Sequence, residues 1–318
     1  MLPSEEGLIS LDTTDKQRHL INENLITKNQ QGAIYDYKFQ LSLKDAPWSE
    51  WLSKPGYFEC KNEYLEKIDS WIHSTKNNIV KGLDRFEYRN LINGTTQVFD
   101  ELYYRFKEKR LRVFRGEYAY HKRIFDNIEF IDGVDGEFIP LSKNDWVIVS
   151  LPFSGIGDVH PQMKRLLDEA QKLGIYVLVD CAWLGTCTDI LFDFTHPAIG
   201  EVCFSLSKGL GLGHMRSGIR YSKVYQEDSI ITQHNNMNHL QLASAQLGIY
   251  QMNNFSPDFI IDKYYQSYLN MCEDFGFQAT KCPHIAIPPS SWDEYINDEK
   301  YYKVGVRNLV KKYYKGEI

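Results

Sequence analysis

The fold is decided by the stretches VLVDCAWLGTC, residues 177–187, and VCFSLSKGLGLGHMRSGIRYS, residues 202–222. Each begins with a short apolar run of the length of one buried β-strand, and each run leads to a charged residue, Asp180 in the first and Lys208 in the second. Near-continuous apolar strands are typical of a parallel sheet covered on both faces. Because ligands collect at the carboxyl ends of such strands, we expect Asp180 and Lys208 to share one site.

The residues before these stretches extend the same alternation of strand and helix. Residues 145–151 (DWVIVSL) are a compact apolar strand, and a helix follows with Pro161 in its first turn and Gly174 at its end. The next strand is expected at residues 175–180. This order predicts an α/β fold in which a mostly parallel sheet is sandwiched by helices.

Changes in pattern along the chain suggest three regions. Residues 1–60 are aromatic and irregular, as expected of an N-terminal arm or part of a small domain. Residues 61–235 carry the alternating pattern and form the expected large, ligand-binding domain. Residues 236–318, with helical stretches near 239–253 and 257–275, are expected to form a short, small α/β domain at the C-terminus.

Composition excludes several classes of protein. A chain of 318 residues with 43% hydrophobic residues can bury a large core. The net charge of -6 is mild and both signs are mixed, so we expect no binding to nucleic acid or to an anionic membrane. The first twenty residues lack a cationic segment followed by an apolar one, and no stretch is apolar enough to span a bilayer, so we expect a cytoplasmic protein.

The six cysteines and nine histidines do not form a metal-binding or disulfide pattern. The sequence has no C-x-x-C pair and no cluster of histidines, which argues against a zinc site and against a disulfide scaffold. We therefore expect reduced, mostly buried thiols and no metal.

Lys208 lies in a Ser-Leu-Ser-Lys sequence, and Arg216 follows eight residues later in Arg-Ser-Gly. The order Asp180, S-x-S-K, R-x-G resembles fold-type I pyridoxal 5′-phosphate (PLP) enzymes of the aspartate aminotransferase superfamily. Within that class I/II group the chain is most similar to histidinol-phosphate aminotransferase-like members. The resemblance implies the PLP-dependent transferase fold. It also implies that Asp180 pairs with the pyridine nitrogen, that Lys208 forms a Schiff base with the cofactor, and that Arg216 holds the phosphate.

The chemistry of PLP explains why these three residue types are needed. An ionised carboxylate near the ring nitrogen favours its protonated form, which makes the ring a better electron sink. A lysine that is partly desolvated beside other cations has a lowered pKa, which suits both attack on the aldehyde and proton transfer. A phosphate dianion is bound well by a guanidinium, by hydroxyls and by the positive end of a helix.

Further segments match the family at the phosphate. LINGTTQVFDELYYRF resembles its glycine-hydroxyl turn at the start of a helix, which implies that the backbone amides of Gly94, Thr95 and Thr96 bind the phosphate. Ser205 and Ser207, which flank Leu206 before the lysine, are expected to add hydroxyl groups.

Other cofactor contacts are expected from the same resemblance. Tyr118 in RGEYAYHKRI is expected to stack on the cofactor ring, with Tyr120 as a second candidate. Tyr57 in PGYFECKNEYL is expected to reach the phosphate of a partner subunit. Two positions depart from the family pattern. Ser154 stands where an asparagine usually contacts the ring hydroxyl, and Trp183 replaces the usual tyrosine and offers only an N–H donor.

The resemblance implies a homodimeric aminotransferase that uses a small-molecule amino donor and a keto acid. Arg307 is the candidate ligand for the substrate carboxylate, and a surface arginine is the other interpretation. The altered ring-hydroxyl site leaves open a PLP-dependent lyase, decarboxylase or racemase-like reaction. A binding protein that has lost catalysis is the third hypothesis. The GLGLG run lacks the G-x-G-x-x-G spacing of a dinucleotide loop.

Overall fold

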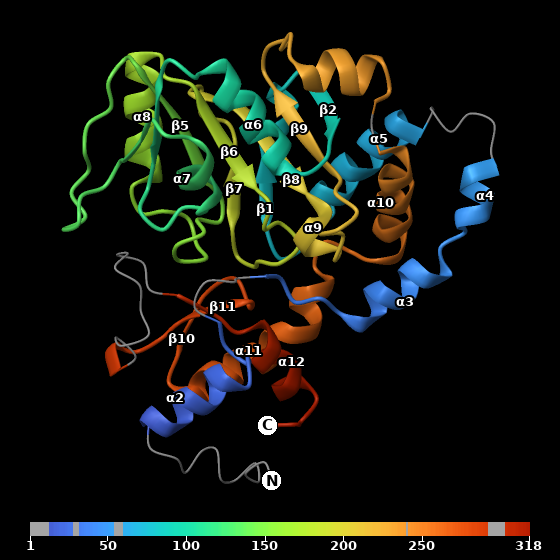
Figure 1. Cartoon of the computed structure of the whole chain (residues 1–318), viewed down its shortest axis with the longest axis vertical. Helices are drawn as coiled ribbons and strands as arrows, with labels where there is room; N and C mark the ends of the chain where they lie inside the picture. The colour runs from blue at the N-terminus through green and yellow to red at the C-terminus, as the bar shows by residue number, and fades with distance from the viewer. Residues whose placement is uncertain (1–12, 28–31, 54–59, 240, 292–302) are drawn as a thin grey trace.

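The computed structural model describes residues 13–27, 32–53, 60–239, 241–291 and 303–318. These residues build two layers: a seven-stranded sheet with its helices, here the large sheet, and a three-stranded sheet with further helices, here the small sheet (Figure 1). A short parallel pair, β1 (Ile79–Lys81) with β7 (Leu191–Asp193), lies beside the large sheet.

The large sheet has the strand order β2-β9-β8-β6-β5-β3-β4. From β8 to β4 neighbouring strands run parallel, whereas β9 is antiparallel to both of its neighbours. The strands are β2 (Tyr88–Ile92), β3 (Arg110–Val113), β4 (Ile128–Phe130), β5 (Asp145–Ser150), β6 (Val177–Cys181), β8 (Ile199–Ser205) and β9 (Gly218–Ser222). This arrangement confirms the expected α/β fold with a mostly parallel sheet.

The two faces of the large sheet are covered by different helices because successive side chains of a strand point to opposite faces. Ile148 and Leu178 belong to one buried cluster with side chains of α6 (Thr95–Arg105). Val147 and Val179 belong to a second cluster with α5 (Cys60–His73), α8 (Met163–Leu173) and α10 (Leu242–Asn254). Each fully buried aliphatic side chain contributes about 1.5–3 kcal/mol, so these clusters hold the sheet and helices together.

Short connections at the carboxyl ends of the strands position the site. α6 begins directly after Gly94, which follows β2. α9 (Leu206–Gly209) follows β8 at the end of the large sheet that faces the small sheet, as Figure 1 shows. Helix α8 begins at Met163, and the expected first-turn Pro161 lies in a turn just before it. α7 (Tyr120–Ile124) and the 3-10 turn Leu83–Arg85 lie in further connections.

The small sheet has the antiparallel order β10-β11-β12. Its strands and the helices beside it are β10 (Gln278–Ala279), β11 (Ile285–Ile287), β12 (Val304–Gly305), α2 (Thr13–Asn22), α11 (Phe259–Phe275) and α12 (Arg307–Tyr314). Thr27 pairs with Gly305 through two backbone hydrogen bonds of 2.9 and 2.7 Å. The described part of the N-terminal region therefore contributes to the small sheet layer.

The remaining N-terminal helices, α3 (Tyr37–Asp45) and α4 (Trp48–Ser53), run toward α10. The sequence-based division at residue 235 assigns α10 to the smaller unit, yet α10 packs on α5 beside the large sheet: a Cβ added to Gly248 would lie 2.6 Å from the Tyr64 ring. The apolar residues of α10 pack against α5. A local helical pattern cannot indicate which layer of the fold a helix packs against. The π-helical segment Ile230–Asn236 precedes α10.

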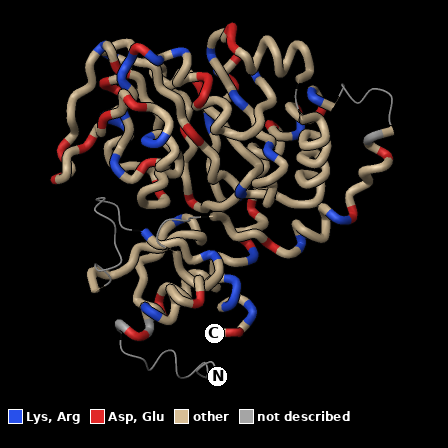
Figure 2. Tube along the Cα trace, viewed as in Figure 1, with Lys and Arg blue, Asp and Glu red and all other residues tan. Residues whose placement is uncertain are grey.

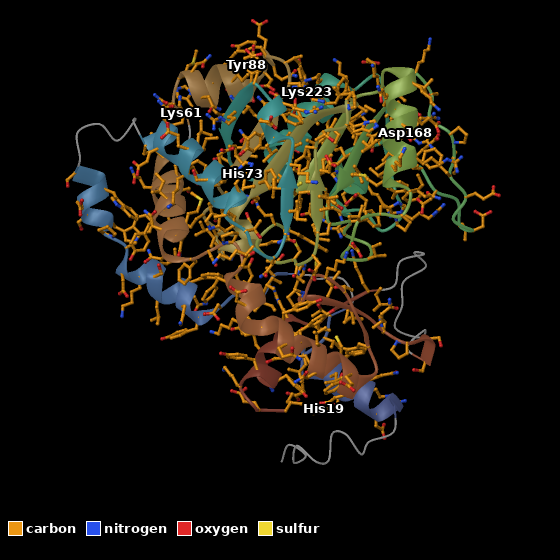
Figure 3. The ribbon with its side chains drawn as sticks, turned by 180° about the vertical axis from the view of Figure 1, so that it is seen from behind. His19, Lys61, His73, Tyr88, Asp168 and Lys223 are labelled. Carbon is orange, nitrogen blue, oxygen red and sulfur yellow. The ribbon has the colours of Figure 1, made fainter. Side chains whose placement is uncertain are left out.

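Charges of both signs alternate along both layers (Figure 2). Figure 3 shows Asp168 on α8, away from the small sheet, where it pairs with Lys164 at 2.6 Å and His196 at 3.3 Å. All six cysteines are buried and free. In the described part of the chain, no helix combines the length and apolarity needed to cross a membrane, and no cluster of three potential metal ligands occurs.

Candidate functional site

Lys208 lies in α9, immediately beyond the end of β8. Burial lowers the pKa of its ammonium group; nearby Asp180 opposes this shift and Arg216 adds to it. Its Nζ has no hydrogen bond or ion pair with the residues that the structure describes. The side chain is therefore a partly buried amine with a weakened preference for the charged form, as a lysine nucleophile requires.

Asp180 ends the apolar part of β6, the strand next to β8, and pairs in register with Cys203. Burial raises the pKa of its carboxyl to about 7, Lys208 counteracts this, and Glu117 raises it further. The carboxylate accepts a 3.0 Å hydrogen bond from the Ala182 amide. The structure thus brings Asp180 and Lys208 together, as the two strand ends predicted.

The predicted anion site lies where β2 turns into α6. Gly94 has φ +84°, and a Cβ there would lie 2.5 Å from Nη2 of Arg216, so only glycine lets the guanidinium approach. Arg216 donates from Nε to the Asn93 carbonyl oxygen at 3.1 Å and from Nη2 to the Thr96 hydroxyl at 2.6 Å. The amides of Thr95 and Thr96 open α6 and have no acceptor within the described ranges.

Ser205 and Ser207 are both buried between β8 and α9. Ser205 caps α9 by accepting from the Ser207 amide at 3.2 Å, and its hydroxyl donates to the Ser207 oxygen at 2.7 Å. The Ser205 hydroxyl also lies 3.5 Å from the carbonyl oxygen of Ser217, the residue after Arg216. Both serines are therefore adjacent to the segment that carries Arg216.

Glu117 is a buried carboxylate that the sequence interpretation missed. It accepts hydrogen bonds from the amide and hydroxyl of Ser150, at 2.8 and 2.6 Å, and from the Tyr118 amide at 2.9 Å. It is close enough to Asp180 to raise the pKa of that carboxyl. An acidic residue directly before the expected stacking tyrosine was the only sequence signal for it.

Ser154 is expected to contact the ring hydroxyl of the cofactor. In the structure it is buried, and its hydroxyl donates to the Gly116 carbonyl oxygen at 2.7 Å, with Oε1 of Glu117 at 3.2 Å. Because a hydroxyl has one proton and Ser154 donates it to Gly116, Ser154 is left as a hydrogen-bond acceptor toward any further partner. The departure from the family pattern is therefore larger than the shorter side chain alone suggested.

Tyr118 keeps 46% of its surface exposed, although it follows the buried Glu117. Its ring is stacked with that of Tyr120, with centroids 5.9 Å apart. The Tyr120 hydroxyl donates to Asp100 at 2.8 Å, which fixes that ring. Tyr118 is thus the more accessible of the two stacking candidates.

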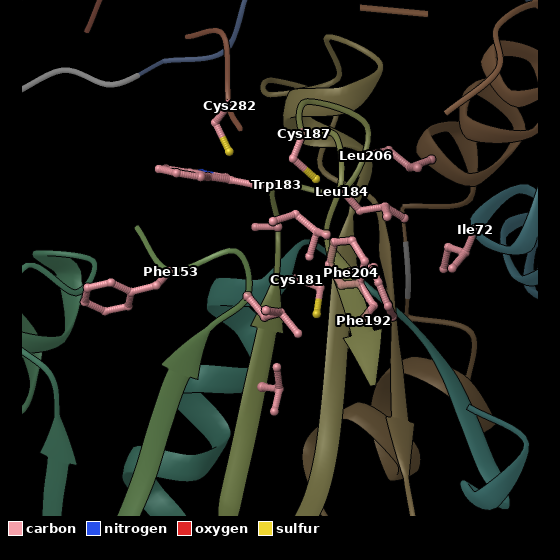
Figure 4. Close-up of a cluster of buried hydrophobic side chains, with 14 of the residues drawn as sticks. Ile72, Phe153, Cys181, Trp183, Leu184, Cys187, Phe192, Phe204, Leu206 and Cys282 are labelled. Carbon is pink, nitrogen blue, oxygen red and sulfur yellow. The ribbon is translucent and has the colours of Figure 1, made fainter. Parts of the chain in front are cut away.

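Trp183 lies above the carboxyl ends of the strands, facing Cys282 of the small sheet layer (Figure 4). Its ring meets the His284 ring edge-on at a centroid distance of 4.5 Å. The Lys303 ammonium lies 5.8 Å from the Trp183 ring centroid and donates to the Ser154 carbonyl oxygen. His284 and Lys303 were not expected from the sequence, because a lone histidine or lysine before a short strand has no distinctive pattern.

Arg307 begins α12, and its guanidinium is pressed against Gly32, where a Cβ would lie 1.9 Å from Nη1. It makes no hydrogen bond or ion pair with the part of the chain that the structure describes. A cation at a helix N-terminus is disfavoured by the helix dipole. The Arg307 side chain is half-buried. Tyr57 lies outside the described residues.

Solved structures with the same architecture are aminotransferases. An aromatic aminotransferase from Pyrococcus horikoshii is 11% identical with a TM-score of 0.63, and the match covers 96% of this chain and 98% of that chain. The histidinol-phosphate aminotransferase from Clostridium acetobutylicum is 12% identical with a TM-score of 0.59, covering 92% and 98%. A mutant aspartate aminotransferase from Thermus thermophilus is 10% identical with a TM-score of 0.59, covering 99% and 96%.

No protein-family model matches the chain, and no curated protein sequence matches it. The similarity to the solved structures shows that the chain has the fold of fold-type I PLP aminotransferases, and this confirms the fold implied by the resemblance. Identities of 10–12% support the fold alone.

Proposed function

We propose that the chain is a PLP-dependent aminotransferase that transfers an amino group between an amino acid or amine and a keto acid. One observation carries the proposal: the Asp180 carboxylate and the Arg216 guanidinium are both close enough to Lys208 to act on the pKa of its ammonium group. A carboxylate, an amine and an anion site match the ring nitrogen, the aldehyde and the phosphate of PLP.

The residues present fit the cofactor. Gly94 leaves room for the Arg216 guanidinium beside the first amides of α6, which have no acceptor within the described ranges. Guanidinium, amides and the helix dipole together make a site for a phosphate dianion. Asp180 is buried and has no ion pair within 4.0 Å among the described residues, so a protonated ring nitrogen would complete its environment.

When bound, PLP supplies a conjugated ring that withdraws electrons from the substrate carbon. Lys208 would hold the cofactor through Nζ and would then move a proton at the substrate carbon; its lowered pKa favours the free amine that accepts this proton. Asp180 would keep the ring nitrogen protonated, because an ionised carboxylate stabilises the adjacent positive charge. Arg307 binds the substrate carboxylate as a two-pronged donor.

A second copy of the chain is the partner that we propose for the exposed side chains beside this site. We propose a homodimer, with Tyr57 directed to the partner's phosphate as the family resemblance implies. Tyr118 and Met215, which flank the expected cofactor region, are 46% and 38% exposed. A second subunit that covers them would remove this apolar surface from water. Analytical ultracentrifugation that finds only monomers at micromolar concentration would refute the dimer.

A lyase or decarboxylase is the second candidate. It is favoured by the environment of Ser154, whose hydroxyl proton is used by Gly116 and Glu117 and which therefore offers an acceptor where the family offers a donor. Formation of ammonia or carbon dioxide without a keto acid would favour this reaction over transamination.

Transfer of ¹⁵N from a labelled amino-acid pool to a pool of keto acids tests the proposal. Wild-type protein with PLP is expected to label at least one keto acid, and Lys208→Ala is expected to abolish the transfer. Lys164→Ala is the matched control, because Lys164 is exposed and pairs with Asp168 on the outside of α8. Equal transfer by wild type and Lys208→Ala would refute the assignment of Lys208.

A further inference from the structure

His284 is a fully buried histidine whose polar atoms are unsatisfied. Its exposed fraction is 0%, and neither Nδ1 nor Nε2 has a hydrogen-bond partner among the described residues. A buried polar group without a partner destabilises a fold, so such groups are rare outside functional sites. The unsatisfied ring nitrogens of His284 therefore indicate that a ligand binds there.

The surroundings of His284 indicate the charge of that ligand. Burial and the neighbouring cations Lys208, Lys303 and Arg307 lower the pKa of His284 to about 3. The neutral ring offers one donor and one acceptor, and the three groups acting on it are all cations. An anionic oxygen near the ring would accept a hydrogen bond from it and would lie in the positive electrostatic potential of the three cations.

The backbone places His284 beside Arg307. The amide of Val306 donates to the His284 carbonyl oxygen at 3.0 Å, where β11 and β12 run side by side, and Arg307 is the next residue. The two side chains that lack hydrogen-bond partners thus come from adjacent strand ends of the small sheet. His284 is also close enough to Lys208 for that ammonium group to act on its pKa.

We propose that His284 is a specificity-determining residue that donates a hydrogen bond to a second acidic group of the substrate, while Arg307 binds the α-carboxylate. This inference rests on the proposed function, because it takes Arg307 as the carboxylate ligand. The substrate class is then an amino acid whose side chain ends in a carboxylate or a phosphate-like group.

Access to His284 requires a side chain to move, because its ring is covered by Trp183. Lys303 lies over the Trp183 ring and is held by the Ser154 carbonyl oxygen. A lysine side chain is flexible, and its ammonium would turn from a neutral carbonyl oxygen toward an incoming anion. The second acidic group reaches the ring when the Trp183 side chain turns aside and Lys303 changes partner.

Calorimetric titration of the PLP-loaded, full-length protein tests this inference without turnover. Succinate and butyrate have equal chain length and differ by one terminal carboxylate. We expect wild type to bind succinate at least about tenfold more tightly, His284→Phe to lose this preference while still binding butyrate, and His284→Gln to retain part of it. 3-Phosphonopropionate, compared in the same way, distinguishes a phosphate-like group from a carboxylate.

Wild type without a preference for either dianion over butyrate, or His284→Phe with the full preference, would overturn the inference. His121→Phe is the matched control: His121 is also buried, with burial lowering its pKa to about 3, but it contacts Tyr103 and Phe99. Loss of the preference in both variants would assign it to loosened packing and also overturn the inference. Absence of a PLP absorption band in wild type would instead refute the proposed function.

Discussion

On the side of the site built from β2, α6 and β9, the Arg216 guanidinium already donates to Asn93 and Thr96. On the side built from the small sheet, neither the Arg307 guanidinium nor the His284 ring has a hydrogen-bond partner in the described part of the chain. The first side is organised before any ligand arrives. The second has side chains that lack hydrogen-bond partners among the described residues.

This difference matches the chemistry that each side is proposed to perform. A resident cofactor is bound most tightly by groups fixed in advance, since no ordering is needed on binding. A substrate must enter and leave in every cycle, so its ligands must be satisfied only while it is bound. The Arg307 guanidinium and the His284 ring are therefore expected to decide substrate specificity. Arg216, which is already held by hydrogen bonds, is expected to decide cofactor affinity.

The largest effect is expected when the negative charge of Asp180 is removed from the cofactor side of the site. Asp180→Asn keeps the shape of the side chain but removes the negative charge that keeps the ring nitrogen protonated. We expect amino transfer to fall by about 10²–10³-fold, as for the loss of other preorganised electrostatic groups, while PLP still binds. Steady-state kinetics measure this, with Asp168→Asn on the outside of α8 as the unchanged control. An Asp180→Asn variant with normal turnover would contradict the assignment.

Gly94→Ala tests the fixed anion site. Two effects combine: φ of +84° disfavours any side chain, and the Cβ would lie 2.5 Å from Arg216 Nη2. Gly174→Ala is the control, since its φ of +67° carries the same kind of strain with no atom within 4 Å. We expect about a tenfold or larger loss of PLP affinity for Gly94→Ala only, measured by fluorescence titration, with about 1 kcal/mol of destabilisation for the control. Equal PLP affinity in both variants would remove Gly94 from the site.

Gly32→Ala tests the substrate side without touching the cofactor side. The added Cβ would lie 1.9 Å from Arg307 Nη1, so the guanidinium must move, and a long flexible side chain can do so at small cost in stability. We expect KM for the amino donor to rise by about tenfold, with PLP affinity unchanged. A fall in PLP affinity of equal size would show that the two sides are not separable.

The smallest expected effect is a difference in acid stability. The folded-state pKa of His284, about 3, lies below the ordinary value near 6.5 because burial disfavours the charged ring. Its contribution to stability is therefore fully present above pH 6.5 and is lost as the pH falls through 3. Relative to His284→Phe, wild type should lose about 1.6 kcal/mol of unfolding free energy between pH 6.5 and pH 5 in urea unfolding. If the unfolding free energies of wild type and His284→Phe changed in parallel with pH, this would contradict a buried and unpaired His284 ring.

The cofactor side could be predicted from sequence because its residues follow local patterns. Asp180 and Lys208 end apolar strands, and parallel strands bring their carboxyl ends to one edge. Gly94 and Thr95 open an amphipathic helix directly after a strand. Each of these signals lies within a few residues of the chain.

The substrate side could not be predicted in the same way. Gly32, His284 and Arg307 are far apart in sequence and meet only through the small sheet, whose strands are two or three residues long. Glu117 was missed because no spacing rule identifies a buried carboxylate that accepts hydrogen bonds from backbone amides and a serine hydroxyl. Arg307 was identified through the family resemblance, and its contact with Gly32 depends on tertiary structure alone.

The most direct test of the central claim is reduction of the PLP-incubated protein with borohydride, followed by peptide mass spectrometry. The account predicts a visible absorption band that borohydride bleaches and a pyridoxyl group covalently fixed on Lys208, with no such adduct at this position in Lys208→Ala. A wild-type protein without the band, or with the adduct on another lysine, would contradict the account.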